Sequence, residues 1–406
     1  MPTGRNFYGV NPNALPTKAA WQLGLQLGNQ VIERFINEEG HYPESIGMVL
    51  WSESNMRTGG QCIAELLCLL GVKPVWQRGS MQVVDLEVIP LDELKRPRID
   101  VTARISGLFR DTMAVAVELI EKAVQLVKEL DEPEDLNFIR KHVLEDIKDL
   151  EAQGVKHDEA ARQAAYRIFG CPPGGYGAGV ALMLEAKSWE TIHDLADTYV
   201  RWGAHVYGSR DEGEYRPELF RNRLSTIEVT IKNIDNHEIH LLNSDDFNAY
   251  CGGLNAAVHS IRGKLPSCYI GDSADRDHSI TKSLDEEFRR VIRGESMNTK
   301  YIEGMKKHGY KGASDLANLV TRAFGWDATS ELMEDWIYEG FAEKLVFNKE
   351  TREWMQSVNP WAFQRMTEKL LEAERRGMWK PKQQTKVELE RLYLEIEGEL
   401  EERSEG

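Results

Sequence analysis

The sequence predicts an α/β fold in which helices cover both faces of a mostly parallel sheet. Two segments share the pattern that indicates it. In each, a short apolar run, 46–51 or 99–105, is followed by a polar stretch and then by apolar residues at helical spacing. The spaced residues of the first helix are Ile63, Leu66, Leu67 and Leu70. Gly71 follows them, and glycine at that position ends helices because it adopts left-handed backbone angles without strain.

Residues 1–130 are expected to form this unit, which in outline is Rossmann-like or flavodoxin-like. Further short strands are predicted at 73–76 and 83–89, and polar turns at 52–60 and 106–111. The apolar face of a second helix is formed by Met113, Val117, Ile120, Val124 and Val127.

Beyond residue 130 the sequence becomes richer in helix-forming segments, and we predict a mixed, helix-rich α+β domain over 131–330. A Gly/Pro-rich turn interrupts it at 170–179, and a strand is predicted at 226–233. Alternation in that strand places Ile227, Val229 and Ile231 inward and Glu228, Thr230 and Lys232 outward. A helical region is expected over 331–406. Its apolar stripe is formed by Leu389, Leu392, Ile396 and Leu400.

Charge and cysteine content restrict the partners and the compartment. The 66 acidic residues exceed the 50 Lys and Arg, for a formal net charge of −16. We therefore expect no nucleic-acid partner, although a local basic pocket is compatible with that balance. The five cysteines form no C-x-x-C pair, and Cys62 and Cys68 lie in an apolar helical stretch. This pattern favours a cytoplasmic protein over a disulfide scaffold or a structural zinc site. We expect no membrane span.

The polar stretches after the two strands are candidate ligand sites, because ligands of open α/β sheets bind beyond the carboxyl ends of strands. Asn55 and Arg57 belong to the first, and Arg104 and Arg110 surround the second. The planar guanidinium of arginine binds carboxylates through two parallel hydrogen bonds, which suits a polycarboxylate ligand. Helix capping and surface ion pairs are the structural alternative for these loops.

Eight segments, in order along the chain, resemble the large subunit of the cobaltochelatase and magnesium chelatase family. They are 4–8, 50–60, 96–102, 105–111, 137–142, 243–247, 308–313 and 359–361. The resemblance covers essentially the whole chain but only the carboxyl-terminal third of such subunits, so we expect a truncated subunit or one piece of a split subunit. Segments 243–247 and 308–313 are closer to the cobalt (CobN-type) branch, whereas 131–142 is shared with the magnesium branch.

The resemblance implies ATP-dependent insertion of Co²⁺ into a corrin-precursor tetrapyrrole, hydrogenobyrinic acid a,c-diamide, in cobalamin biosynthesis. It implies that AAA+ ATPase partner subunits hydrolyse the ATP, and the sequence accordingly has no G-x-x-x-x-G-K-[ST] loop. A split subunit also implies a separate amino-terminal large-subunit chain. The alternatives are a magnesium chelatase that inserts Mg²⁺ into protoporphyrin IX, a non-catalytic tetrapyrrole-binding module, and an unrelated flavodoxin-like protein that retains flavin.

Metal insertion removes two pyrrole N–H protons and strips water from the ion, so it needs a base and oxygen or imidazole ligands. His308, in a glycine-flanked turn within 308–313, is the candidate proton acceptor and transient metal ligand, with a structural histidine as the alternative. Asp245 is the candidate metal-side carboxylate, with helix capping as the alternative. The predicted substrate-side residues are Asn55, Arg57, Arg104 and Arg110.

Two weaker patterns remain. His237 and His240 form H-x-x-H, which lacks the i, i+4 spacing of helical zinc sites. Gly175, Gly177 and Gly179 form G-x-G-x-G without an evident preceding strand. The glycine pattern indicates an ordinary turn or a flexible loop near the substrate rather than a nucleotide site.

Overall fold

The computed structural model describes residues 11–405, so the similar segment 4–8 lies outside the described residues. The chain divides into two compact units. Unit 1 comprises the described residues up to 180 together with 189–237 and 253–283, and unit 2 comprises 181–188, 238–252 and 284–405. These units do not coincide with the predicted boundaries at 130 and 330, because strands from both sides of residue 130 join one sheet.

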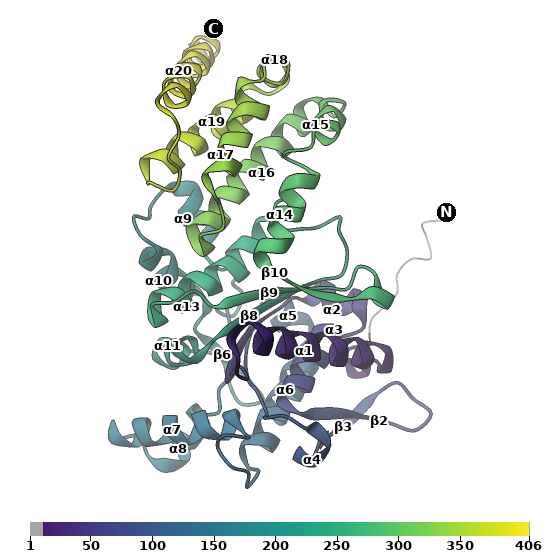
Figure 1. Cartoon of the computed structure of the whole chain (residues 1–406). Helices are drawn as coiled ribbons and strands as arrows, with labels where there is room; N and C mark the ends of the chain where they lie inside the picture. Colours follow the sequence, from purple (N-terminus) through teal and green to yellow (C-terminus); the bar gives the residue numbers. More distant parts are fainter. Residues whose placement is uncertain (1–10, 406) are drawn as a thin grey trace. The chain divides into compact units, whose positions relative to one another are not determined.

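Unit 1 is built on an eight-stranded sheet in the order β10-β9-β8-β1-β4-β5-β6-β7 (Figure 1). Its strands are β1 (Ser45–Leu50), β4 (Asp100–Ile105), β5 (Ile168–Gly170), β6 (His205–Tyr207), β7 (Glu212–Tyr215), β8 (Val229–Ile234), β9 (Ser267–Asp272) and β10 (Ile280–Ser283). The strands from β9 to β5 in this order run parallel, and antiparallel strands complete both edges. The predicted α/β class with a mostly parallel sheet is therefore confirmed.

The strands predicted at 73–76 and 83–89 form outside this sheet. β2 (Val72–Trp76) and β3 (Val83–Val88) pair with each other as a separate antiparallel hairpin. The short connection explains the difference, since a parallel pair needs a crossover of a dozen residues or more.

Helices cover both faces of the sheet. One face is covered by α1 and α3, and α6 packs beside α3. The other face is covered by α10, α11 and α13. The helices of unit 1 used below are α1 (Lys18–Glu39), α2 (Ser52–Thr58), α3 (Gln61–Leu70), α5 (Gly107–Thr112), α6 (Ala114–Lys128), α7 (Phe138–Ala152), α8 (His157–Gln163), α10 (Ile192–Gly203), α11 (Pro217–Thr226) and α13 (Gly253–Arg262). Because both faces are covered, the outward positions predicted for Thr230 and Lys232 are wrong, and both side chains are buried within β8.

Several local predictions need correction. The segments predicted as polar turns contain the short helices α2 and α5, and the Ser106 hydroxyl caps α5 by accepting the Phe109 N–H at 3.1 Å. The G-x-G-x-G loop does follow a strand, because β5 ends at Gly170. The helix that precedes Gly71 is confirmed as α3, and Gly71 has a left-handed φ of 74°.

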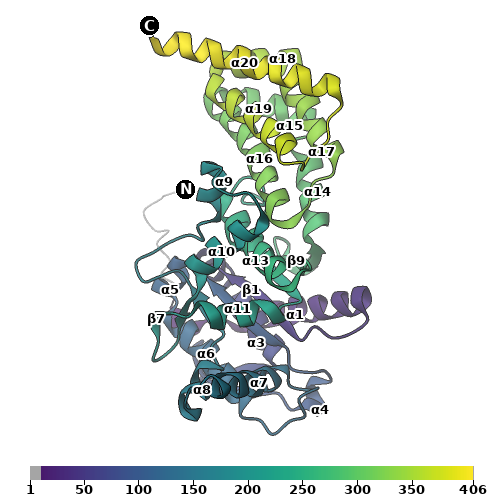
Figure 2. The same ribbon diagram turned by 90° about the vertical axis from the view of Figure 1, so that its left-hand side faces the viewer.

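Unit 2 is helical in its long carboxyl-terminal segment (Figures 1 and 2). Its elements are α9 (Val180–Ala186), α12 (Asp245–Phe247), the π-helix η3 (Asn248–Gly252), α14 (Leu284–Gly294), α15 (Thr299–Lys306), α16 (Gly309–Ser330), α17 (Asp335–Phe341), the π-helix η5 (Ala342–Phe347), α18 (Lys349–Val358), α19 (Pro360–Arg375) and α20 (Gln383–Glu405). The predicted stripe of α20 buries Leu389, Leu392 and Ile396. Among the described helices, none has the length and apolar character needed to cross a bilayer.

Candidate functional site

Unit 1 brings the two predicted ligand loops together at the carboxyl ends of β1 and β4. These strands are neighbours, with Leu50 in register with Ile105. α2 and α5 follow them and contact each other, and Ser52 Oγ lies 2.6 Å from Thr112 Oγ1. The two loops are therefore close in space, whereas their role in ligand binding stays a prediction.

Asn55 and Arg57 both have partners within unit 1. Asn55 is fully buried, and its amide donates to the Trp51 carbonyl at 2.7 Å. The Arg57 guanidinium donates to the two carboxylate oxygens of Asp235 at 2.6 and 2.9 Å. Asp235 directly follows β8, so this pair links the carboxyl ends of two neighbouring strands. Asp235 therefore occupies Nε and one terminal nitrogen of the Arg57 guanidinium.

Arg104 and Arg110 are also engaged. Arg104 is buried in β4, where it donates to the Ile105 carbonyl at 2.7 Å and lies 5.3 Å from the centre of the Tyr199 ring. Arg110 pairs with Asp111 at 2.6 Å, and this hydrogen bond raises the pKa of Arg110. It also donates to two carbonyls of the glycine-rich loop 170–179, Pro172 at 2.6 Å and Gly175 at 3.1 Å. Arg110 therefore holds that loop against α5.

His308 and Asp245 lie in unit 2, and both are exposed. His308 immediately precedes α16, and Asp245 is the first residue of α12, close to Arg322 near the middle of α16. The helix between His308 and Arg322 is roughly 20 Å long. The two candidates therefore do not ligate one ion in this structure. Among the described residues, no group of three or more His, Cys, Asp or Glu side chains is arranged to hold a metal ion.

The H-x-x-H histidines bind separate carboxylates. His237 Nε2 lies 2.9 Å from Asp272, in unit 1. In unit 2, His240 Nδ1 accepts the Leu242 N–H at 3.2 Å, so its Nε2 carries the proton that faces Glu295 at 2.8 Å. Both ring nitrogens of His240 are occupied, which indicates a structural histidine.

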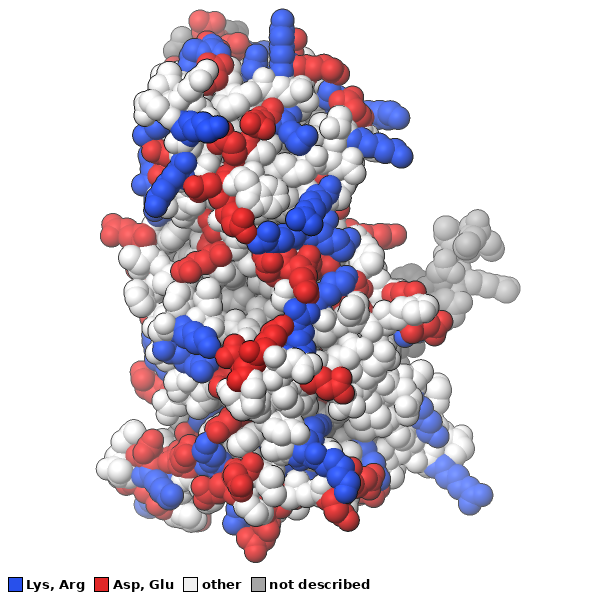
Figure 3. Space-filling model, in the orientation of Figure 1, with Lys and Arg blue, Asp and Glu red and all other residues white. Residues whose placement is uncertain are grey.

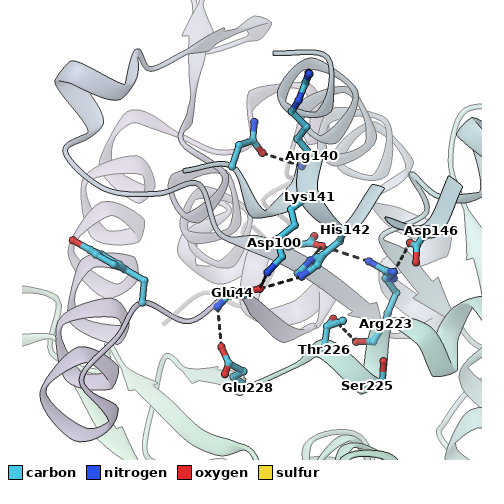
Figure 4. Close-up of polar contacts among 12 residues, drawn as sticks. Glu44, Asp100, Arg140, Lys141, His142, Asp146, Arg223, Ser225, Thr226 and Glu228 are labelled. Carbon is cyan, nitrogen blue, oxygen red and sulfur yellow. Dashed lines mark hydrogen bonds and ion pairs between the residues drawn. The ribbon is translucent and has the colours of Figure 1, made fainter. Parts of the chain in front are cut away.

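Sequence reasoning missed a cluster of buried charges at the amino end of β4 (Figure 4). Asp100, the first residue of β4, accepts from Arg167 Nε at 2.6 Å and faces His142 Nδ1 at 2.8 Å. Arg223 on α11 pairs with Asp146 on α7, and its Nη1 lies 3.5 Å from Asp100. This charge cluster joins α7, β4 and α11.

The electrostatics of the charge cluster follow from burial and pairing. Burial alone raises the pKa of Asp100, but the Arg167 charge and the hydrogen bond from His142 lower it overall. Burial and the Arg167 charge lower the pKa of Arg223 to about 10. The available sequence signal was a charged residue inside an apolar strand, Asp100 within the predicted run 99–105.

A cleft of about 690 Å³ lies in unit 1, between α6, α8 and the turn from β6 to β7. Two of its cations already have partners: Lys122 pairs with Asp85 at 2.7 Å and Arg162 with Asp211 at 2.7 Å. None of the predicted site residues lines it.

Comparison with known proteins identifies the family. The model of the family described as CobN/Magnesium Chelatase matches residues 1–386. The chain belongs to this family. Membership contradicts the alternative of an unrelated flavin-binding protein.

Individual relatives show how much of a large subunit the chain represents. An uncharacterized protein of Methanocaldococcus jannaschii is 49% identical over 99% of the chain, and the aerobic cobaltochelatase subunit CobN of Pseudomonas aeruginosa is 45% identical over 98%. A magnesium-chelatase subunit of Chlorobaculum parvum is 31% identical over 99%. The chain spans 33%, 32% and 31% of these relatives, respectively. It is thus about a third of their length.

A solved structure supports the same assignment. The catalytic subunit of cobaltochelatase from Mycobacterium tuberculosis matches 98% of the chain with a TM-score of 0.94 and 42% sequence identity, and the match covers 33% of that subunit.

Proposed function

We propose that this CobN/magnesium chelatase family member is the carboxyl-terminal part of a cobaltochelatase large subunit. In this proposal it acts in the cytoplasm with the amino-terminal remainder of the subunit and AAA+ ATPase partners. Together they insert Co²⁺ into hydrogenobyrinic acid a,c-diamide at the expense of ATP. The carrying observation is the higher identity to CobN, 45%, than to the magnesium-chelatase subunit of Chlorobaculum parvum, 31%.

The reaction exchanges two protons for one divalent ion. Two pyrrole N–H bonds break, both nitrogens bind Co²⁺, and two protons leave. We propose Asp245 as an oxygen ligand that replaces water on the incoming ion, because Co²⁺ accepts carboxylate and imidazole ligands. His308 is retained as a proposed proton acceptor. Because roughly 20 Å of α16 separates His308 from Arg322, the neighbour of Asp245, we propose that His308 and Asp245 serve different steps.

The magnesium alternative is tested by titration. We expect the purified chain to shift the absorbance spectrum of hydrogenobyrinic acid a,c-diamide at lower concentration than that of protoporphyrin IX. The comparison is made at fixed salt, because carboxylate recognition weakens as ionic strength rises. Preferential binding of protoporphyrin IX would contradict the cobalt assignment and favour the magnesium branch.

A further inference from the structure

Two neighbouring arginines in unit 2 donate to an amide or carbonyl oxygen and form no ion pair with any described residue. They are Arg322 on α16 and Arg365 on α19, two helices that pack side by side (Figures 1 and 2). Arg365 donates to Asn318 Oδ1 at 2.9 Å, and Arg322 donates to the Leu242 carbonyl at 3.3 Å. Asn318 lies one turn before Arg322 on the same side of α16, so both guanidinium groups face the same side of the helix pair.

This arrangement differs from that of the arginines that are paired with carboxylates. Arg57 and Arg289, for example, are neutralised by carboxylates at 2.6 and 2.8 Å. Arg322 is half-buried, and this burial lowers its pKa. The carboxylates of Asp245 and Asp315 raise the pKa, and the positive charge of Arg365 lowers it. Two guanidinium groups with open donors are suited to binding an anion with two oxygens.

An exposed aromatic surface adjoins these arginines. Trp361 lies one turn before Arg365 on α19 and is 57% exposed. Tyr310, at the start of α16, is 61% exposed, and the Asn359 amide donates to its carbonyl at 3.2 Å. This bond ties the starts of α16 and α19 together. Exposed rings can pack on the flat face of an aromatic ligand, whereas neighbouring arginines bind its acidic arms.

We propose that Arg322 and Arg365 bind the carboxylate side chains of the tetrapyrrole and that Trp361 packs against its ring. The inference rests on the proposed function and names a substrate-binding surface for it. It also places the macrocycle next to Asp245, the neighbour of Arg322 and the proposed metal-side residue. Figure 3 shows acidic and basic side chains interspersed over the visible face of the molecule, so charge alone does not mark such a surface.

The test measures binding of hydrogenobyrinic acid a,c-diamide to the purified full chain by tryptophan fluorescence quenching. We expect Arg322→Gln and Arg365→Gln each to weaken binding by about ten-fold, because each removes a charged hydrogen-bond donor. Trp361→Ala should weaken it roughly five-fold. Arg365→Lys should retain an intermediate affinity, since it keeps the charge but loses the planar fork.

The matched control variants change residues on α14 and α17 of unit 2. Arg289→Gln removes an arginine already paired with Asp285, and Trp336→Ala removes a tryptophan that is 40% exposed. Both should bind like the wild type. The wild type should bind the methyl ester of the macrocycle about ten-fold more weakly than it binds the free acid. Arg365→Gln should bind the ester as tightly as the wild type does, because the ester has no carboxylate for Arg365 to bind.

The outcomes separate the two proposals. If the wild type binds the macrocycle and the arginine variants bind it equally well, this inference fails while the proposed function stands. If those variants instead lose association with the amino-terminal part of the subunit, the surface binds protein and the inference is also wrong. If the wild-type chain binds no tetrapyrrole, the inference fails, and the proposed function is judged by metal insertion in the assembled enzyme. Circular dichroism of each variant establishes that it is folded.

Discussion

Glu65 is a fully buried carboxyl group on α3, packed near α1 and β8. Burial raises the pKa of Glu65 from its ordinary 4.5 to about 7, although a hydrogen bond from the Asn233 amide lowers it. The unfolded chain loses this proton at lower pH than the folded chain does. The free energy of unfolding therefore falls as pH rises from about 4.5 to about 7, and above this window the cost is on the order of 3 kcal/mol.

The variant Glu65→Gln replaces this carboxyl group with a neutral amide of the same shape. We expect it to be about 2–3 kcal/mol more stable than the wild type at pH 8, with the gain vanishing near pH 5. Urea denaturation across that range measures the difference. Glu33→Gln, at an exposed position of α1, is the control and should not change the profile. A less stable Glu65→Gln at pH 8 would show that the ionised carboxylate has favourable partners.

Individual residues also show how far the sequence predicts a site. The strand pattern correctly placed Arg57 at the carboxyl edge of the sheet, but its partner Asp235 lies 178 residues away and no local pattern reports it. Arg322 offered a local signal that was overlooked: no acid lies three or four positions from it along the helix. That Arg365 lies on the same side depends on the packing of α16 against α19, which is a tertiary contact.

Secondary structure was predictable where an element was long enough for its apolar residues to show a regular spacing. α3, α6 and the strands β1 and β4 all have clear apolar patterns. β5 has three residues and α5 has six, too few to show a period. Alternation misled in β8, because helices cover both faces and Lys232 is buried with its ammonium group 3.8 Å from the centre of the Trp51 ring.

The charge cluster at Asp100 gives a prediction about how elements are held together. Asp100→Asn leaves the Arg167 guanidinium buried without its counter-ion, so we expect a loss of about 3–5 kcal/mol in the free energy of unfolding. Glu388→Gln is the contrast, because it breaks an exposed pair with Arg391 at 2.6 Å and should cost less than about 1 kcal/mol. Denaturant titration compares them. Equal stabilities of the two variants would mean that the cluster does not hold α7, β4 and α11.

At the scale of the whole molecule, the net charge of −16 does not reveal which arginines are available to bind an anionic ligand. The sequence predicted a positive pocket from Arg57, Arg104 and Arg110, and their contacts within unit 1 occupy all three. The cations without ion pairs that carry our proposal are Arg322 and Arg365 in unit 2. Composition therefore limits the overall field of the protein, whereas pairing decides which cations are available to a ligand.

The final prediction concerns what the chain does alone. It spans about a third of its relatives and contains no phosphate-binding loop of the P-loop type. We therefore expect the purified chain, given Co²⁺ and ATP, to leave hydrogenobyrinic acid a,c-diamide unmetallated over hours, as followed by absorbance. Adding the amino-terminal two-thirds of the subunit and the AAA+ partners should restore insertion, and omitting ATP should abolish it again.

Variants in the assembled enzyme then distinguish catalysis from simple carriage of the macrocycle. Asp245→Asn should bind the macrocycle like the wild type but lower the rate of Co²⁺ insertion by at least about ten-fold, because an amide oxygen is a weaker ligand than a carboxylate for a divalent ion. Asp158→Asn, on α8 of unit 1, is the matched control and should keep the full rate. ATP-independent insertion by the chain alone would overturn the division of labour proposed here. An assembled enzyme that binds the macrocycle yet never inserts Co²⁺ would identify the chain as a non-catalytic tetrapyrrole-binding module.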